Sequence, residues 1–72
     1  MDENELLQTF GLNLKFQRLK RKMSQEQLAE ALNFSSVYIS NVEGGKHNIS
    51  LVNALKFCEY FNTTVENLIV EK

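Results

Sequence analysis

The side chains of this sequence that could carry out catalysis are few and far apart. There is one histidine, His47, one cysteine, Cys58, and one aspartate, Asp2, and no phosphate-binding glycine loop or nucleophile motif accompanies them. Acid-base chemistry and metal binding both need several such groups held together. We therefore expect no enzymatic activity, no metal site and no cofactor. Cys58 lies on an apolar helical stripe, which favours a small core residue over a nucleophile.

Hydrogen-bonding side chains are instead concentrated in residues 35–43, which predict a short helix with two unlike sides. Ile39 and Val42, three residues apart, give it an apolar side. The opposite side is small and polar and is formed by Ser36, Val37, Ser40 and Asn41. A helix with such a side fits a recognition-helix arrangement, because the DNA major groove admits one helix of this kind. An ordinary solvated helix surface has the same composition and is the favoured interpretation of this pattern taken alone.

Capping residues divide the chain into five short helices. The predicted first residues or caps are Asp2, Ser24, Ser35, Ser50 and Thr64, and Ser24 with Gln27 forms a capping box. The first helix is expected to extend to about Lys22, and Asn33 and Gly44-Gly45 are expected to end the second and third. No strand pattern is present, so the sequence predicts an all-α fold in a single domain over residues 1–72.

Apolar residues at helical spacing predict which side of each helix faces the core. In chain order the expected inward residues of the other helices are Leu6, Leu7, Phe10 and Leu14; Leu28, Ala29 and Leu32; Leu51, Leu55, Cys58 and Phe61; and Val65, Leu68 and Ile69.

Composition and charge limit the partners. Hydrophobic residues make up 43% and charged residues 24% of the chain, typical of a globular protein, and no stretch predicts a membrane span or a signal peptide. We therefore expect a cytoplasmic protein with no membrane partner. The net charge of -1 argues mildly against nucleic-acid binding, but residues 15–46 carry six basic residues against three acidic ones. The basic residues from Arg18 to Lys22 could equally be a solvated helix end.

Several segments together resemble the Cro/C1-type helix-turn-helix family. They are Arg18, Ser24-Gln25-Glu26-Gln27-Leu28-Ala29, Tyr38-Ile39-Ser40-Asn41-Val42-Glu43-Gly44-Gly45-Lys46, then Leu55, Cys58, Phe61 and Leu68. The resemblance covers about residues 10–69, and residues 37–40 and 47–51 are further similar to the controller proteins of restriction-modification systems. It implies a lambda-repressor-like DNA-binding domain whose second and third helices form the helix-turn-helix. Asn33 replaces the family's usual turn glycine, and Gln17 replaces a usual leucine.

By this resemblance the chain is a sequence-specific regulator that binds double-stranded DNA and has no small-molecule substrate. The residues expected to read bases are Ser36, Val37, Tyr38, Ser40 and Asn41. Those expected to contact phosphates are Ser24, Gln25, Ser35, Lys46, His47 and Asn48, although a plain surface role is nearly as good an explanation of His47. Arg18 and Glu43 occupy positions that form an internal ion pair in the family.

A domain of this size makes few base contacts, so we expect a homodimer that reads two half-sites about 34 Å apart. The expected contact residues lie in the last two helices and are Phe57, Tyr60, Val65, Ile69 and Val70, unless these simply complete the core. A second apolar stripe is formed by Leu12, Phe16 and Leu19. The alternative function is a protein-interaction module that keeps the helix-turn-helix shape but has little affinity for DNA.

Overall fold

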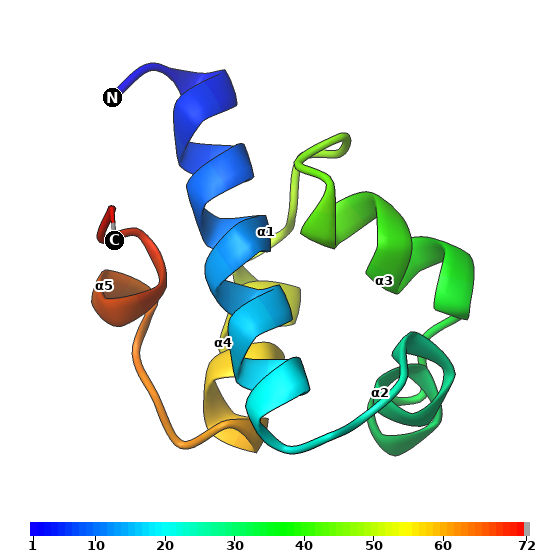
Figure 1. Ribbon diagram of the computed structural model, residues 1–72. Helices are drawn as coiled ribbons and strands as arrows, with labels where there is room; N and C mark the ends of the chain where they lie inside the picture. Colours follow the sequence, from blue (N-terminus) through cyan, green and yellow to red (C-terminus); the bar gives the residue numbers. More distant parts are fainter. Residues whose placement is uncertain (72) are drawn as a thin grey trace.

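The computed structural model describes residues 1–71, which form five α-helices and no strand (Figure 1). The helices are α1 (Glu3–Lys20), α2 (Gln25–Leu32), α3 (Ser36–Glu43), α4 (Leu51–Tyr60) and α5 (Val65–Leu68). Each begins directly after a predicted cap, whose side-chain oxygen accepts a hydrogen bond from the backbone N–H three residues later. The expected all-α fold is confirmed.

The long helix α1 runs through the middle of the molecule and is flanked by the other elements. In Figure 1, α2 and α3 lie on one side of α1, α5 lies on the other side, and α4 lies behind. The turn between α2 and α3 passes through Asn33, which has the left-handed backbone conformation (φ 59°) that asparagine tolerates. This turn sets the angle between the two helices of the helix-turn-helix.

Phe57 of α4 is fully buried at the centre of an aromatic cluster. Its ring lies 6.5 Å from that of Phe10, 5.4 Å from that of Phe34 and 6.5 Å from that of Tyr38. Aromatic pairs at these separations add to the stabilisation that their buried area supplies. The cluster joins α1, the α2–α3 turn, α3 and α4 in one core.

The prediction for the inward side of α4 is partly wrong. Cys58 and Phe61 are buried as expected, but Leu51 and Leu55 are 71% and 50% exposed. Ala54 and Phe57 are buried in their place. Both sets have helical spacing, because α4 has apolar residues at most positions, and the fit of Phe57 among the other aromatic rings selects the observed one.

Two residues of α1 fix distant parts of the chain against it. Gly11 lies so close to the end of α3 that an added Cβ would be 2.2 Å from the Val42 carbonyl oxygen. Asn13 is buried, and its Nδ2 donates to the carbonyl oxygens of Leu68 (2.8 Å), the last residue of α5, and of Val70 (2.9 Å), two residues further on. These contacts hold α3 and α5 on opposite sides of the same helix.

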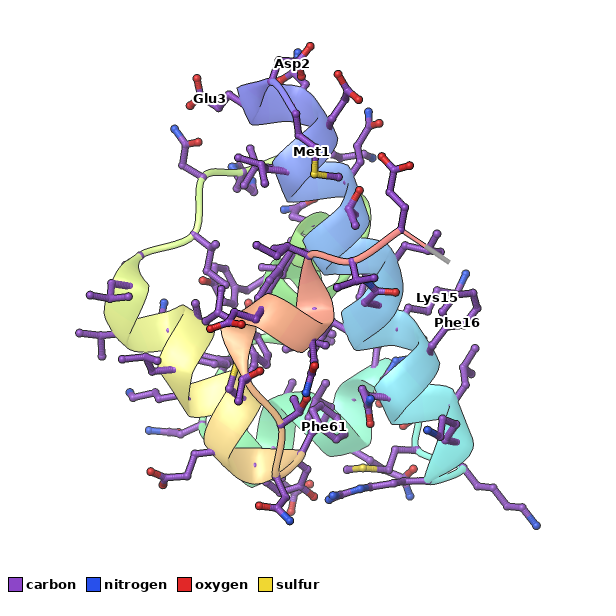
Figure 2. The ribbon with its side chains drawn as sticks, turned by 90° about the vertical axis from the view of Figure 1, so that its left-hand side faces the viewer. Met1, Asp2, Glu3, Lys15, Phe16 and Phe61 are labelled. Atoms are coloured by element: carbon purple, nitrogen blue, oxygen red, sulfur yellow. The ribbon has the colours of Figure 1, made fainter. Side chains whose placement is uncertain are left out.

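The expected second apolar stripe on α1 is exposed. Leu12, Phe16 and Leu19 are 49%, 43% and 49% exposed, and Phe16 projects away from the side where α4 lies (Figure 2). Within residues 1–71, none of the helices combines the length and apolar character needed to cross a membrane.

Candidate nucleic-acid interface

The inner side of α3 is firmly held. Ile39 and Val42 are 0% and 3% exposed and share the core with the fully buried Leu28 of α2. Ser35 caps the helix by accepting from the Tyr38 backbone N–H at 3.0 Å. One face of α3 is therefore fixed against the core, and the opposite face is left to contact other molecules.

A buried ion pair fixes the C-terminal end of α3 to α1. The Arg18 Nε donates to Glu43 Oε2 at 2.7 Å and its Nη2 donates to Glu43 Oε1 at 3.0 Å, in the two-point geometry that arginine and carboxylate favour. The Arg18 Nη1 also donates to the Met23 carbonyl oxygen at 2.7 Å. The pair implied by the resemblance is present, and it connects residues 25 positions apart in the chain.

Gln25, at the start of α2, is bound to the same ion pair. Its Nε2 donates to Glu43 Oε1 at 3.1 Å, which ties the first turn of α2 to the end of α3. One hydrogen of the amide is used in this bond, and the second can still be donated to another acceptor. Sequence reasoning predicted Gln25 as a phosphate contact but missed this internal partner.

The polar side chains on the outer side of α3 form no hydrogen bonds within the described residues. Val37 is 68% exposed, Ser40 is exposed, and Ser36 and Asn41 are half-buried. Within residues 1–71, the three polar side chains among them make no hydrogen bond to the protein, and no other segment covers Val37. Donors and acceptors that the fold leaves free can be used by a base edge.

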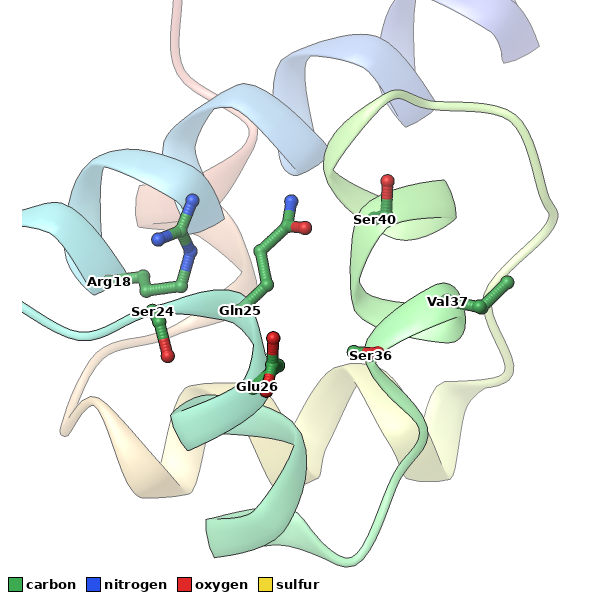
Figure 3. Close-up of a pocket in the computed structure, with 7 residues that line it drawn as sticks. All are labelled: Arg18, Ser24, Gln25, Glu26, Ser36, Val37 and Ser40. Carbon is green, nitrogen blue, oxygen red and sulfur yellow. The ribbon is translucent and has the colours of Figure 1, made fainter.

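A groove of about 490 Å³ separates the start of α2 from α3 (Figure 3). Its lining residues are Arg18, Ser24, Gln25, Glu26, Ser36, Val37 and Ser40. The Ser24 oxygen accepts from the Gln27 backbone N–H at 3.0 Å, so the Ser24 hydroxyl proton can still be donated. The charge of Arg18 is balanced by Glu43, whereas the exposed Glu26 carboxylate has no cation within salt-bridge distance among the described residues. The groove thus offers hydrogen-bond donors and one carboxylate.

Tyr38 has internal partners that the sequence did not predict. Its ring packs against Phe34 at 5.0 Å and lies nearly parallel to that of Phe57, and its hydroxyl oxygen accepts a hydrogen bond from Asn53 Nδ2 at 2.9 Å. Tyr38 therefore lies on the flank of α3 that faces α4, away from the outer face centred on Val37. Its ring packs against the core, and the predicted base contact of Tyr38 stays a prediction.

The predicted phosphate contacts of the loop after α3 are all exposed. Lys46, His47 and Asn48 lie between the end of α3 and the cap of α4. Gly44 and Gly45 end α3, and Gly45 adopts a left-handed conformation (φ +68°) beside Gln8 of α1. This packing fixes where the loop begins.

The expected dimer residues are not equally accessible. Phe57 is fully buried, so the prediction that it contacts a partner is wrong. Tyr60, Val65 and Ile69 are half-buried, and Val70 is 52% exposed. Leu51 and Val52 of α4 are 71% and 62% exposed, although Leu51 was expected to face inward.

Burial also decides the chemistry of Cys58. The Cys58 thiol, on α4, lies in the hydrophobic core of the protein. Burial raises its pKa above the ordinary value, so the thiol is protonated at neutral pH. A protonated, buried thiol is a poor nucleophile. His47 lies in the exposed loop, on a different element.

Comparison with known proteins places this geometry in a family. Residues 14–68 match the helix-turn-helix family, and the chain belongs to its Cro/C1-type branch, a family of DNA-binding regulators. The control protein C.MunI of a Mycoplasma species is 35% identical over 66 residues, covering 90% of this chain and 89% of the relative. An uncharacterized HTH-type transcriptional regulator of Methanocaldococcus jannaschii is 33% identical over 57 residues, covering 79% and 86% of the two chains.

Two solved structures are similar along most of the chain. The restriction-modification controller protein C.AhdI from Aeromonas hydrophila has a TM-score of 0.77 at 35% identity, and the match covers 86% of this chain and 94% of the C.AhdI chain. The hypothetical transcription factor NHTF from Neisseria has a TM-score of 0.83 at 28% identity, and the match covers 97% of this chain and 80% of the NHTF chain. The similarity to controller proteins that the sequence indicated is thus confirmed.

Proposed function

We propose that the chain is a sequence-specific transcription regulator that inserts the outer face of α3 into the DNA major groove. The observation that carries this proposal is the contrast within α3: Ile39 and Val42 are buried, whereas Val37 and Ser40 are exposed and uncovered by the rest of the chain. Asn41 would pair with adenine, Val37 would contact a thymine methyl, and Ser36 and Ser40 would supply single hydrogen bonds. The two controller relatives support a regulatory role of this kind.

Phosphate contacts would hold α3 in register without reading sequence. The start of α2 offers the Ser24 hydroxyl proton and the second amide hydrogen of Gln25, beside the positive end of the helix dipole. Lys46 of the exposed loop adds a positive charge, and His47 and Asn48 add further donors.

Selection of bound sites from random duplex DNA tests the proposal. The wild-type chain is expected to enrich one motif, and Asn41→Ala is expected to lose the preference at one base position while still folding. Asn67→Ala, an exposed substitution of the same type on α5, which lies on the other side of α1 from α3 (Figure 1), is the control. Absence of any enriched motif, or an unchanged motif with Asn41→Ala, would contradict the assignment of the reading face.

We further propose a homodimer on a two-fold operator, with an interface that overlaps only partly with the one expected from the sequence. Leu51, Val52 and Leu55 form an exposed ridge on α4, and beside it lies a groove of about 280 Å³ whose lining is entirely apolar. Val65 and Ile69, two of the expected dimer residues, line this groove together with Ile49 and α1 side chains. A ridge and an adjacent groove on one patch suit an isologous contact, in which each copy supplies both parts.

Paired substitutions of equal exposure test this interface. Leu55 is 50% exposed and Leu12, on the α1 stripe, is 49% exposed. Sedimentation should give a dimer for the wild type and for Leu12→Lys, and a monomer for Leu55→Lys. The opposite pattern would assign the contact to the α1 stripe, and a wild-type monomer bound to a single half-site would overturn the dimer.

Two observations favour the alternative of a protein-interaction module. Among residues 1–71 the Glu26 carboxylate, which lines the groove beside α3, has no cation partner, and the whole chain has a net charge of -1. Both oppose phosphate binding. Titration with random duplex DNA at several salt concentrations separates the two functions. A DNA-binding chain loses affinity steeply as salt rises, whereas an interaction module shows little binding at any salt.

A further inference from the structure

The hydrogen bond between Asn53 and Tyr38 has a direction that leaves one polar hydrogen unused. The Asn53 Nδ2 is the donor and the Tyr38 hydroxyl oxygen is the acceptor, at 2.9 Å. A phenol has one hydrogen to donate, and among residues 1–71 no group accepts it. The hydroxyl is therefore oriented by an internal partner and still has its proton to donate.

The surroundings of Tyr38 fix where that hydroxyl lies. Both ring contacts, with Phe34 at 5.0 Å and with Phe57 at 6.5 Å, hold the aromatic plane in place. Asn53 is itself held, because its backbone N–H donates to the Ser50 hydroxyl oxygen at 3.1 Å in the first turn of α4. Tyr38 and Asn53 are both half-buried, and their hydrogen bond is only partly buried. The phenol thus has little freedom to turn away.

The position of Tyr38 on α3 indicates which part of the DNA could accept its hydroxyl proton. A helix in the major groove has a base edge before its outer face and a sugar-phosphate backbone along each flank. The start of α2 occupies one flank of α3, where Ser36 and Ser40 line the shared groove. Tyr38 occupies the other flank, where α4 begins. Phosphate oxygens accept hydrogen bonds and donate none, so they match a lone donor.

We infer that the Tyr38 hydroxyl donates to a DNA phosphate on the α4 flank of the recognition helix, and that Asn53 is the residue that positions it. This inference rests on the proposed DNA-binding function. Tyr38 is thereby a backbone contact and not a base reader, and Asn53 acts only through Tyr38. The two flanks of α3 would then each hold one strand of the duplex.

Removal of the hydroxyl alone is the first test, and the chain supplies its own control. Tyr38→Phe should weaken binding to the selected duplex about tenfold, the usual effect of losing one hydrogen bond to a charged group. Tyr60→Phe removes the other tyrosine hydroxyl, which donates to the Met23 sulfur at 3.7 Å, and should leave the affinity unchanged. The motif selected from random DNA should be the same for Tyr38→Phe, because a phosphate contact carries no sequence information.

Substitutions of Asn53 test the positioning role and the direction of the bond. Asn53→Leu cannot donate, so it should weaken binding in the wild-type chain but cause no further loss in the Tyr38→Phe background. Asn53→Asp provides an acceptor that takes the Tyr38 proton, so it should lose at least as much affinity as Tyr38→Phe while the unfolding midpoint is retained. A purely structural role would lower the midpoint without this dependence on the Tyr38 hydroxyl.

The possible failures are distinguishable. If the wild-type chain binds no duplex, the proposed function and this inference both fall. If the wild type binds and Tyr38→Phe binds equally well, only the phosphate contact is overturned. A changed motif with Tyr38→Phe would make Tyr38 a base reader, and wild-type affinity in Asn53→Asp would show that the proton does not point to DNA.

Discussion

The two sides of α3 differ in how completely the protein uses their side chains. On the inner side Ile39 and Val42 are buried, and the carboxylate of Glu43 receives three hydrogen bonds, two from Arg18 and one from Gln25. On the outer side Ser36, Ser40 and Asn41 make no side-chain hydrogen bond within the described part of the chain. A helix that reads DNA needs one side packed against its own protein and the other side free to bind bases. Mutations on the two sides should therefore affect stability and sequence readout separately.

Loss of Glu43 should have the largest effect on the inner side. Glu43→Ala leaves the buried Arg18 guanidinium without its carboxylate, which should cost about 3 to 5 kcal/mol of unfolding free energy. Urea unfolding followed by circular dichroism measures it. The double variant Arg18→Met with Glu43→Leu should recover much of the loss, because no buried charge is then left unpaired. A Glu43→Ala midpoint equal to that of the wild type would show that the pair contributes little.

Gly11→Ala should be the next most damaging substitution. Alanine favours a helix interior by about 1 kcal/mol, but here its Cβ would lie 2.2 Å from the Val42 carbonyl oxygen, and backbone must move to admit it. We expect a net destabilisation of about 1 to 3 kcal/mol by urea unfolding. Gly44→Ala is the control, since the nearest atom to its Cβ would be 3.4 Å away. Equal stability of the two variants would argue against close contact between α1 and the end of α3.

Ser24 lies at the boundary between the two regions, because it caps α2 and lines the groove. Ser24→Ala should lower the unfolding free energy by about 1 kcal/mol and also weaken DNA binding. Ser24→Asp keeps an N-cap acceptor but places a negative charge beside the phosphate position. It should therefore retain stability and bind DNA more weakly than Ser24→Ala. Stronger binding by the aspartate variant would place the phosphate elsewhere.

Substitution on the outer side should change stability least. Asn41→Ala is expected to alter the unfolding free energy by no more than about 0.5 kcal/mol. If Asn41 pairs with adenine, the same variant should lose about 1 to 3 kcal/mol of discrimination at that base position. Competition binding with single-base variants of the selected duplex measures this loss. Equal discrimination by wild type and variant would remove Asn41 from the reading face.

Local signals in the sequence were enough to predict the helix starts. The caps at Asp2, Ser24, Ser35, Ser50 and Thr64 each bond within three residues, so the information lies in a short stretch of chain. Helix α3 and its buried positions, Ile39 and Val42, were also predicted, from the cap at Ser35 and the spacing of the apolar residues. The ion pair came instead from the family resemblance, because nothing local in the sequence relates residues 18 and 43.

What the sequence could not predict depends on contacts between distant segments. The inward face of α4 was misassigned because two apolar stripes have equal spacing, and only the packing of Phe57 among rings from other elements selects one. The internal partners of Tyr38, which are Phe34, Phe57 and Asn53, were missed for the same reason. Asn13 was missed because its partners lie 55 and 57 residues away. Gly11 lets the end of α3 approach α1, and nothing in the local sequence indicates that contact.

Backbone amide chemical shifts, recorded by NMR while the selected duplex is titrated into the protein, test the central claim most directly. We predict that the largest changes fall on residues 36–41 of α3 and at the start of α2, with little change at Leu12, Phe16 and Leu19 on α1. Large changes on α1 together with an unchanged outer face of α3 would contradict the proposal that this face reads DNA.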